Sequence, residues 1–222
     1  KGMVVNADEK TAKGAFSMED LVLSIKDATH PKPFVEGKHL ERWLPATNKW
    51  LEWDTERAPA LFSRPTFPEF YEVQEKILVQ RSPGPDPKAC YDKENLHFTE
   101  SSVGIVPWHY LSGVRNKSLQ KASRYADEKP RSDLPRREDL EATSRRFDIK
   151  FLLAVMNSDA ACDFLRANRR SNIHIYPDDW KKLPIPEATK EQQADIVALV
   201  NQILDLKRQY AEPCEIEQLE IR

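Results

Sequence analysis

Two groups of basic residues have the types and the spacing that suit the binding of a polyanion. The first group recurs at intervals that would place its members along one edge of a partly helical segment: Arg115, Lys117, Lys121 and Arg124. The second ends a predicted helix and opens a polar loop: Arg166, Asn168, Arg169, Arg170, Asn172 and His174. Arg and Lys match the charge of phosphate, and Arg or Asn can pair with two atoms on a guanine or adenine edge. The alternative is a solvated surface with favourable cations at a helix C-terminus, and the sequence leaves both interpretations open.

Motifs for other kinds of chemistry are missing from the sequence. It contains no G-x-G-x-x-G, no P-loop and no Asn-Pro-Pro-Tyr, so a cradle for a nucleotide or for S-adenosylmethionine is not expected. The histidines show no i, i+4 pair, and Cys90, Cys162 and Cys214 are far apart, so neither a metal site nor a disulfide framework is expected. Asp86 imitates a metal-dependent nuclease pattern when it is combined with 148–150 or with 179–181, but such spacings often arise by chance. We therefore expect no catalytic residues, no metal and no cofactor in this chain.

The total charge is nearly balanced, but the local charge is not. The 222 residues include 34 Lys and Arg against 36 Asp and Glu, which argues against a protein that binds any nucleic acid through net charge alone. Residues 113–150 contain eleven basic and seven acidic residues, whereas residues 190–222 contain four basic and seven acidic ones. Such a distribution fits a polyanion bound on one side only. No apolar run approaches the roughly 20 residues that span a bilayer, and the first residue is not Met, so we expect a cytoplasmic protein that is a fragment of a longer chain.

Hydrophobic patterning predicts an α+β fold, with a small twisted mixed sheet followed by C-terminal helices. Residues 33–45 predict a turn and a short helical segment, residues 59–71 a helix and turn, and the polar stretch 112–146 a long loop or weakly packed insertion. Thr189 is a good N-cap for a long amphipathic helix over 191–210. The other expected strands are 2–7, 17–27 (with a turn), 50–53, 75–81, 90–92, 96–99, 103–108 and 173–176, and the other expected helices are 147–156 and 158–169.

Several short motifs occur in an order that resembles a known family. The longest is Pro33-Phe34-Val35-Glu36-Gly37-Lys38-His39-Leu40-Glu41-Arg42-Trp43; the others are 2–8 with Ala15-Phe16, Lys76-Ile77-Leu78-Val79, Tyr91-Asp92, 103–107, Leu152-Leu153-Ala154-Val155-Met156-Asn157-Ser158, Leu183-Pro184-Ile185-Pro186 and Glu191-Gln192-Gln193. This order is similar to that of target recognition domains of bacterial restriction-modification enzymes. The nearest likeness is the TaqI-type C-terminal specificity domain of type IIG enzymes, and type I specificity subunits are more distant. His39 stands where Asp is commoner in the family, and 112–146 matches no family motif.

The resemblance implies a domain that binds a specific short sequence of double-stranded DNA for an adenine methyltransferase domain of the same polypeptide. S-adenosylmethionine would then belong to the parent enzyme. A target recognition domain would cover 1–186, divided into a sheet-rich part (1–111), a variable basic loop (112–146) and a helical part (147–186), and 187–222 would join it to the parent. The expected phosphate contacts are Arg115, Lys117, Lys121, Arg124, Arg169 and Arg170, and the candidates for base reading are Arg81, Asn172 and His174.

A protein–protein interaction module is the alternative to DNA recognition. In that interpretation the same domain would use an aromatic surface and its last helix to bind another protein, without contact to DNA. The aromatic residues in question are Trp50, Trp53, Phe67 and Phe70.

Overall fold

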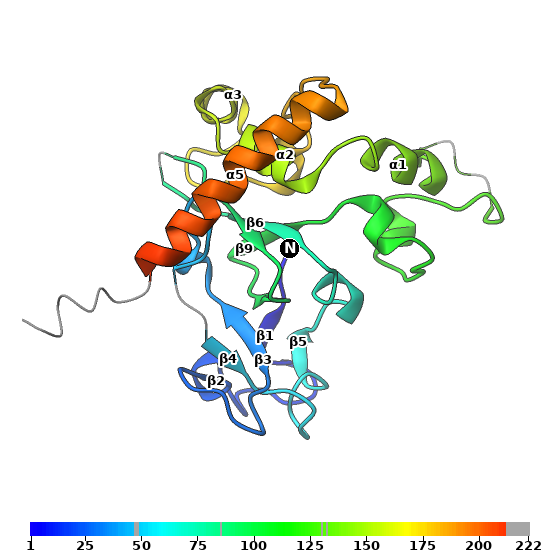
Figure 1. Cartoon of the computed structure of the whole chain (residues 1–222). Helices are drawn as coiled ribbons and strands as arrows, with labels where there is room; N and C mark the ends of the chain where they lie inside the picture. The colour runs from blue at the N-terminus through cyan, green and yellow to red at the C-terminus, as the bar shows by residue number, and fades with distance from the viewer. Residues whose placement is uncertain (47–48, 85, 130, 132, 212–222) are drawn as a thin grey trace, which may run out of the picture.

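The protein has an α+β fold in which small sheets form one part of the molecule and helices cover another (Figure 1). The computed structural model describes residues 1–46, 49–84, 86–129, 131 and 133–211. Within these ranges three small sheets have the strand orders β1-β5, β2-β4-β3-β8 and β7-β6-β9. The strands are β1 (Val4–Ala7), β2 (Val22–Leu23), β3 (Lys32–Val35), β4 (Lys49–Leu51), β5 (Phe62–Arg64), β6 (Lys76–Gln80), β7 (Ala89–Asp92), β8 (His97–Phe98) and β9 (Ser102–Ile105). The predicted fold class is confirmed, with three sheets in place of one.

The helices gather after residue 136. They are α1 (Arg137–Ser144), α2 (Ile149–Met156), α3 (Asp159–Asn168), α4 (Pro177–Trp180) and α5 (Lys190–Ala211). In Figure 1, α2, α3 and α5 lie together above the strands, while α1 lies to one side in a separate projection. No helix in the part of the chain that the structure describes has the length and the apolar composition needed to cross a membrane.

The N-terminal part of the chain folds around its own core. β3 pairs antiparallel with β4 and parallel with β8, which makes the four-stranded sheet mixed. Phe34 on β3 and Phe98 on β8 are fully buried there. The prediction of a turn at this point was wrong because Pro33 and Gly37 are turn formers in isolation, whereas strands on both sides of β3 impose an extended backbone. The predicted helical segment is reduced to one 3₁₀ turn at Gly37–His39.

β6 and β7 are shared between two cores. Successive side chains of a strand point to opposite faces, so Leu78 and Cys90 enter the N-terminal core while Ile77 and Val79 enter a second core beneath the helices. These residues are fully buried, or very nearly so. This explains why the strand predicted at 75–81 contains a continuous apolar run instead of alternating apolar and polar residues.

One buried ion pair fixes the end of this strand pair. Lys76 lies opposite Asp92 in the antiparallel ladder, and Lys76 Nζ lies 2.6 Å from Asp92 Oδ2, with both side chains fully buried. Lys76 Nζ also donates to the carbonyl oxygen of Tyr71. The Asp92 carboxylate accepts the backbone N–H groups of Glu94 and Leu96, so it shapes the turn that leads to β8.

The Asn-Ser pair that follows α2 has a structural task at each position. The Asn157 side chain, which is buried, accepts the backbone N–H of Ala89 at 3.1 Å and donates to the Ala89 carbonyl at 2.9 Å, so it binds the edge of β7 as another strand would. Ser158 Oγ accepts the backbone N–H of Ala161 and is the N-cap of α3, as predicted. The two residues therefore lock the junction of α2 and α3 onto the sheet.

The Gln residues at the start of α5 explain where that helix lies. Thr189 and Gln192 exchange hydrogen bonds between side chain and backbone and cap the helix, as predicted. Gln193 is buried; its Oε1 accepts the backbone N–H of Asp148 at 2.9 Å and its Nε2 donates to the carbonyl oxygens of Arg146 and Ala188. The start of α5 is thereby attached to the start of α2, and the long helix predicted over 191–210 is confirmed.

The stretch 112–146, predicted as a long loop or a weakly packed insertion, forms a projection, and the prediction misses its two helical segments. It contains a 3₁₀ turn (Leu119–Lys121) and α1, whose residues Arg137 and Glu141 are buried. The Arg137 guanidinium lies 4.4 Å from the ring centre of Trp108 and 5.3 Å from that of Tyr125, and Arg115 covers Tyr125 at 4.4 Å. Alternating cations and aromatic rings therefore stabilise the projection beside a small apolar cluster that contains Leu119.

Residues 173–176 do not form the predicted strand. Only Ile175 makes a ladder-like bond, from its N–H to the carbonyl oxygen of Arg81. The Tyr176 N–H is accepted by the Asp179 carboxylate at 2.8 Å, so Tyr176 is the N-cap residue of α4. Side-chain capping of the next helix therefore prevails over strand pairing here.

Burial of His97 predicts a loss of stability in mildly acidic solution. Its ring stacks on Tyr71 with centroids 4.7 Å apart and is 1% exposed, and this burial, with the nearby Lys32 cation, lowers the pKa of His97 from 6.5 to about 3. The unfolded chain therefore binds a proton in a range of pH where the folded protein does not. We expect the free energy of unfolding to fall by up to about 1.4 kcal/mol per pH unit as the pH decreases from 6.5 toward 3.

The variant His97→Phe, which keeps a ring on Tyr71, isolates this contribution. Urea unfolding between pH 7.5 and 4.5 should show a shallower loss of stability for the variant than for the natural chain. Equal slopes for the two proteins would contradict the assignment.

Candidate nucleic-acid interface

An apolar cleft of about 580 Å³ lies between the sheet and the projection 112–146. β9 and the residues after it form its floor, from Val103 to Val106, and Phe67 and Phe70 form one side. The projection supplies Ser118, Leu119 and Ala122, and α4 supplies Pro177 and Trp180. We call it the β9 cleft. Gly104 is required in its floor, because a Cβ there would lie 2.7 Å from Phe98 Cζ and 2.8 Å from Phe70 Cζ.

The charged groups on the β9 cleft have one sign. Lys1, Arg64 and Lys181 line it, and no Asp or Glu occurs among the described lining residues. Arg64 is exposed and donates to the carbonyl oxygen of Gly2 at 3.2 Å. Lys181 is exposed and lies 3.1 Å from Asp178, which is outside the cleft. The cleft therefore combines an apolar interior with cations, which suits an anion that has an apolar body.

The first predicted basic group is split by the fold. Lys117 and Lys121 are exposed beside the cleft wall formed by 118–122, and neither makes an ion pair with a described residue. Arg115 instead makes a two-point bond to Asp127, at 2.9 and 3.0 Å, and this bond lowers the pKa of the Asp127 carboxyl. Arg124 is half-buried, and its backbone carbonyl accepts the N–H of Arg137. Of the four predicted cations, Lys117 and Lys121 are the two that are exposed and make no ion pair with a described residue.

Two members of the second group come together with Arg81 around Tyr176. The guanidinium groups of Arg81 and Arg170 lie 5.3 and 5.0 Å from the centre of the Tyr176 ring, and His174 meets the ring edge-on at 6.0 Å. His174 Nδ1 lies 2.7 Å from Ser82 Oγ, so residues near 82 and 174 are held side by side. Asn172 is exposed on the same loop. We call Arg81, Arg170, His174 and Tyr176 the Tyr176 cluster; it brings together two predicted base-reading candidates, Arg81 and His174, that are about ninety positions apart in the sequence.

Carboxylates neutralise part of the positive charge of the Tyr176 cluster. Arg170 lies 3.6 Å from Asp178 and 3.5 Å from Asp179, and Asp178 is also bound by Lys181. Lys181 and Arg170 lower the pKa of the Asp178 carboxyl, which therefore stays ionised. Arg169 is half-buried with Nη1 3.5 Å from the Gly84 carbonyl oxygen. Of the two arginines predicted here as phosphate contacts, Arg170 is the exposed one.

Each carboxylate that imitates a nuclease pattern has a different partner in the fold. Asp86 forms an ion pair with Arg166, Asp148 caps α2 through the N–H of Lys150, and Asp179 is buried under Tyr176. Among the described residues, no group of three or more His, Cys, Asp or Glu side chains is placed to hold a metal ion. Cys90 and Cys162 are buried free thiols, and Cys214 lies outside the described residues.

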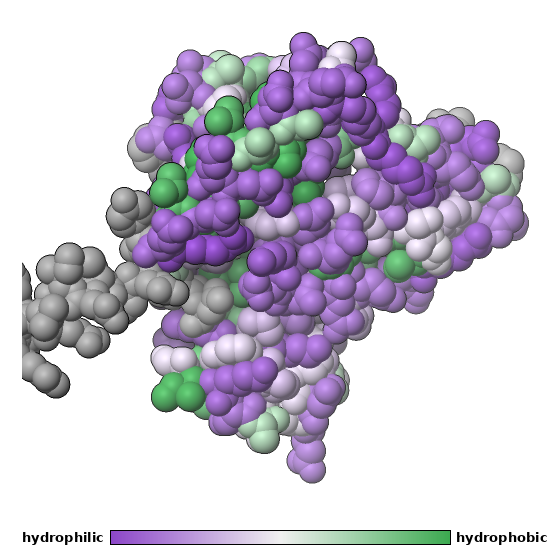
Figure 2. Space-filling view, in the orientation of Figure 1, coloured by the Kyte–Doolittle hydropathy of each residue, from purple (hydrophilic) through white to green (hydrophobic). Residues whose placement is uncertain are grey.

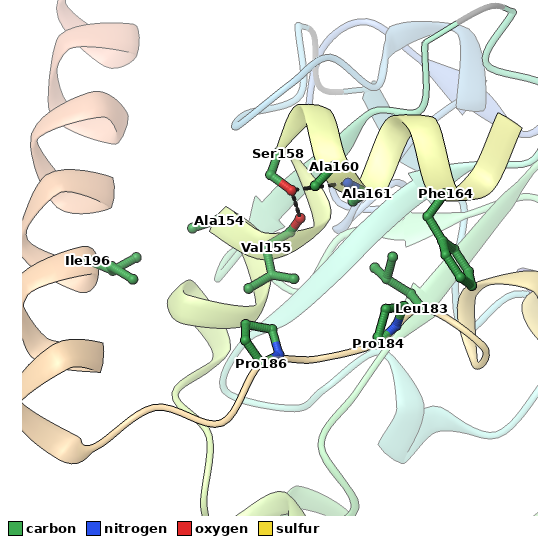
Figure 3. Close-up of a pocket in the computed structure, with 10 residues that line it drawn as sticks. All are labelled: Ala154, Val155, Ser158, Ala160, Ala161, Phe164, Leu183, Pro184, Pro186 and Ile196. Carbon is green, nitrogen blue, oxygen red and sulfur yellow. Dashed lines mark hydrogen bonds between the residues drawn. The ribbon is translucent and has the colours of Figure 1, made fainter. Parts of the chain in front are cut away.

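A second depression, of about 360 Å³, lies where α5 meets α2 and α3 (Figure 3). Ile196 points from α5 toward Val155 on α2, and the Leu183-Pro184 segment and Pro186 close the other side. Farther along α5, Leu199 is 59% exposed and Leu206 is 51% exposed, and Figure 2 shows apolar side chains along this helix among polar ones. The apolar stripe predicted for this helix is therefore divided: Val200 and Leu204 pack on the protein, and Leu199 and Leu206 do not.

Sequence reasoning missed the residues that shape the β9 cleft. Trp108, Trp180 and Lys181 were not predicted to bind a ligand, and Phe67 and Phe70 were assigned to an aromatic protein-binding surface. The other two members of that surface are half-buried: Trp53 packs against Phe62 and His97, and Trp50 lies under Lys26. The run Tyr-Pro-Asp-Asp-Trp-Lys-Lys contained a signal, since it places an aromatic residue and cations next to a helix-capping aspartate.

The chain matches no protein-family model and no curated protein.

Proposed function

We propose that this chain is a recognition domain for a specific sequence of double-stranded DNA, within a restriction-modification adenine methyltransferase. The observation that carries the proposal is that both basic groups adjoin, in the sequence, segments that line the β9 cleft, whose described lining residues include no Asp or Glu. Lys117 and Lys121 are next to lining residues of the projection, and the Tyr176 cluster directly precedes the lining residues of α4. Cations on two sides of a depression suit the two phosphate backbones that flank a groove of DNA.

The proposal assigns different tasks to the two groups. Lys117 and Lys121 are flexible point charges without a carboxylate partner among the described residues, so they suit phosphate contacts that are independent of sequence. The Arg81 guanidinium lies against Tyr176, and His174 contacts Tyr176 and Ser82, and such fixed groups suit the reading of base edges in the major groove. Asn172 is exposed on the same loop as His174. The order of motifs that resembles target recognition domains supports the same function and implies that the methyl transfer belongs to another domain.

Salt dependence of binding tests the phosphate contacts. We expect this chain to enrich a common sequence from a library of random duplexes, with an affinity that falls linearly with salt on logarithmic axes. Replacing Lys117 and Lys121 together by Ala should lower the magnitude of that slope by about 2 and weaken binding to all duplexes similarly. Fluorescence anisotropy over a salt series measures both quantities.

The matched control is Lys10→Ala with Lys13→Ala, two exposed lysines that do not line the cleft. This pair should leave the slope unchanged. Failure to enrich any sequence, or an equal change of slope in the control, would refute DNA recognition through this surface.

The exposed apolar residues of α5 favour a second task, which is attachment to another protein domain. Leu199 and Leu206 are solvated, and the depression beside Ile196 has Ser158 as its single polar lining side chain among described residues. In the proposed parent enzyme these residues face the methyltransferase domain. In the rival interpretation, the chain would act only by binding another protein through these residues, and it would enrich no DNA sequence.

A further inference from the structure

We propose that the β9 cleft binds a single unstacked nucleotide, with its base against the aromatic walls and its phosphate at the cations. The proposal goes beyond the proposed DNA recognition, because it concerns a site for one nucleotide that free mononucleotides can also enter. It stands on the shape, the lining and the charge of the cleft, and it requires no duplex.

The size of the cleft fits one nucleotide. Its volume of about 580 Å³ lies within the range of small-molecule sites. A DNA duplex is far too wide to enter such a space, since even its major groove is about 12 Å across. A duplex can therefore lie only across the rim of the cleft, and the apolar interior needs another occupant.

The walls suit a flat aromatic ring. Phe67 and Phe70 lie on one side with ring centroids 5.6 Å apart, and Trp108 and Trp180 lie on others. Arg137 covers one face of Trp108, which leaves its other side to the cleft and keeps the indole in place. Every nucleobase has a face that stacks on such rings, so the recognition tolerates different bases.

The polar groups suit an anion that also accepts hydrogen bonds. Arg64 and Lys181 supply positive charge without a carboxylate among the described lining residues. The Arg64 guanidinium and the Lys181 ammonium are also hydrogen-bond donors, so they suit the oxygens of a phosphate.

Indole signals in a nuclear magnetic resonance titration with deoxyadenosine 5′-monophosphate test the site directly. We expect saturable shifts for Trp108 and Trp180, assigned with Trp108→Phe and Trp180→Phe, with a dissociation constant on the order of 1 mM. The signals of Trp43, Trp50 and Trp53, which do not line the cleft, should stay in place. Deoxyadenosine and inorganic phosphate, which each lack one half of the ligand, should bind about tenfold more weakly.

Two pairs of variants control for folding and for general charge. Ala122→Phe fills the cleft and should abolish the shifts, whereas Ala126→Phe makes the same change at an exposed position outside the lining. Lys181→Gln should weaken binding severalfold, and Lys182→Gln, its exposed neighbour outside the lining, should not. All four proteins should give otherwise unchanged spectra.

The outcomes separate this site from the proposed function. Absence of saturable shifts at Trp108 and Trp180, or equal affinity for inorganic phosphate and the mononucleotide, would overturn the nucleotide site even if the chain enriches a DNA sequence. Binding of the mononucleotide with no enrichment of any duplex would support the site and refute the proposed DNA recognition.

Discussion

Replacing Asp92 by Ala should lower the free energy of unfolding by about 3–5 kcal/mol, because it leaves a buried ammonium group without its counter-charge. Lys76 Nζ would keep only the carbonyl oxygen of Tyr71, and the N–H groups of Glu94 and Leu96 would lose their acceptor. Urea unfolding followed by far-ultraviolet circular dichroism measures the change. Asp205→Ala is the control: Asp205 forms an exposed ion pair with Arg208, and loss of a surface ion pair costs about 1 kcal/mol or less.

The Asp92→Ala effect should depend on pH in a defined direction. Burial lowers the pKa of Lys76, so between that value and 10.5 the unfolded chain binds more protons and stability rises with pH. Asp92 raises the pKa of Lys76, so its removal lowers that pKa further and widens this window. The variant should therefore recover stability as the solution is made alkaline. The double variant Lys76→Met, Asp92→Leu should regain part of the loss at neutral pH. A single variant as stable as the natural chain would contradict a buried charged pair.

Replacing Arg137 by Ala should detach the projection 112–146 from the body of the protein, with a loss of about 3 kcal/mol. Arg137 is 1% exposed, contacts the rings of Trp108 and Tyr125, and lies 3.6 Å from Glu141. Its loss leaves a cavity between two rings and a buried carboxylate. Hydrogen exchange should accelerate first in 112–146, while α2 and α5 stay protected.

Arg136→Ala is the matched control for Arg137→Ala. Arg136 is the neighbouring residue, but it is exposed and lies 3.7 Å from Glu138, so its replacement should change stability by less than about 0.5 kcal/mol. Equal exchange rates in the two variants would show that the contacts between cations and rings do not hold the projection. Loss of protection in α2 and α5 at the same rate would show that the projection and the body unfold together.

The regular elements were predictable where local chemistry and burial agree. β6 has a continuous apolar run, α3 begins after its N-cap Ser158, and α5 begins after Thr189. Each of these signals lies within a few residues of the element it predicts. The class of the fold followed from these elements. β3 was missed because its extended backbone depends on strands about fifteen and sixty residues away in the sequence.

The projection was unpredictable for a different reason. Its largest buried side chain is Arg137, and its helix α1 buries Arg137 and Glu141. Methods that detect a core from apolar periodicity interpret such residues as solvated, and only the tertiary position of Trp108 and Tyr125 reverses that interpretation. The buried ion pair of Lys76 and Asp92 escaped notice in the same way.

Spacing located the basic groups but did not determine which cations are available. Arg115 and Lys117 are two positions apart, yet Asp127 returns to bind Arg115 and leaves Lys117 in solvent. Arg81 and His174 are brought together by contacts between segments about ninety residues apart, and such contacts cannot be predicted from a single sequence. The β9 cleft was not visible at all, because its lining comes from five separate segments.

The double burial of β6 and β7 limits how this polypeptide can be dissected for experiments. An expression fragment that ends near 111 would retain both strands but leave Ile77, Val79 and Tyr91 facing water, and one that begins near 112 would leave the inner faces of α2 and α5 uncovered. We therefore expect neither half to fold stably alone, although the sequence suggests a boundary between a sheet-rich and a helical part. Segment exchange with other proteins is therefore best confined to the projection, whose ends at Ser112 and Arg146 leave both shared strands intact.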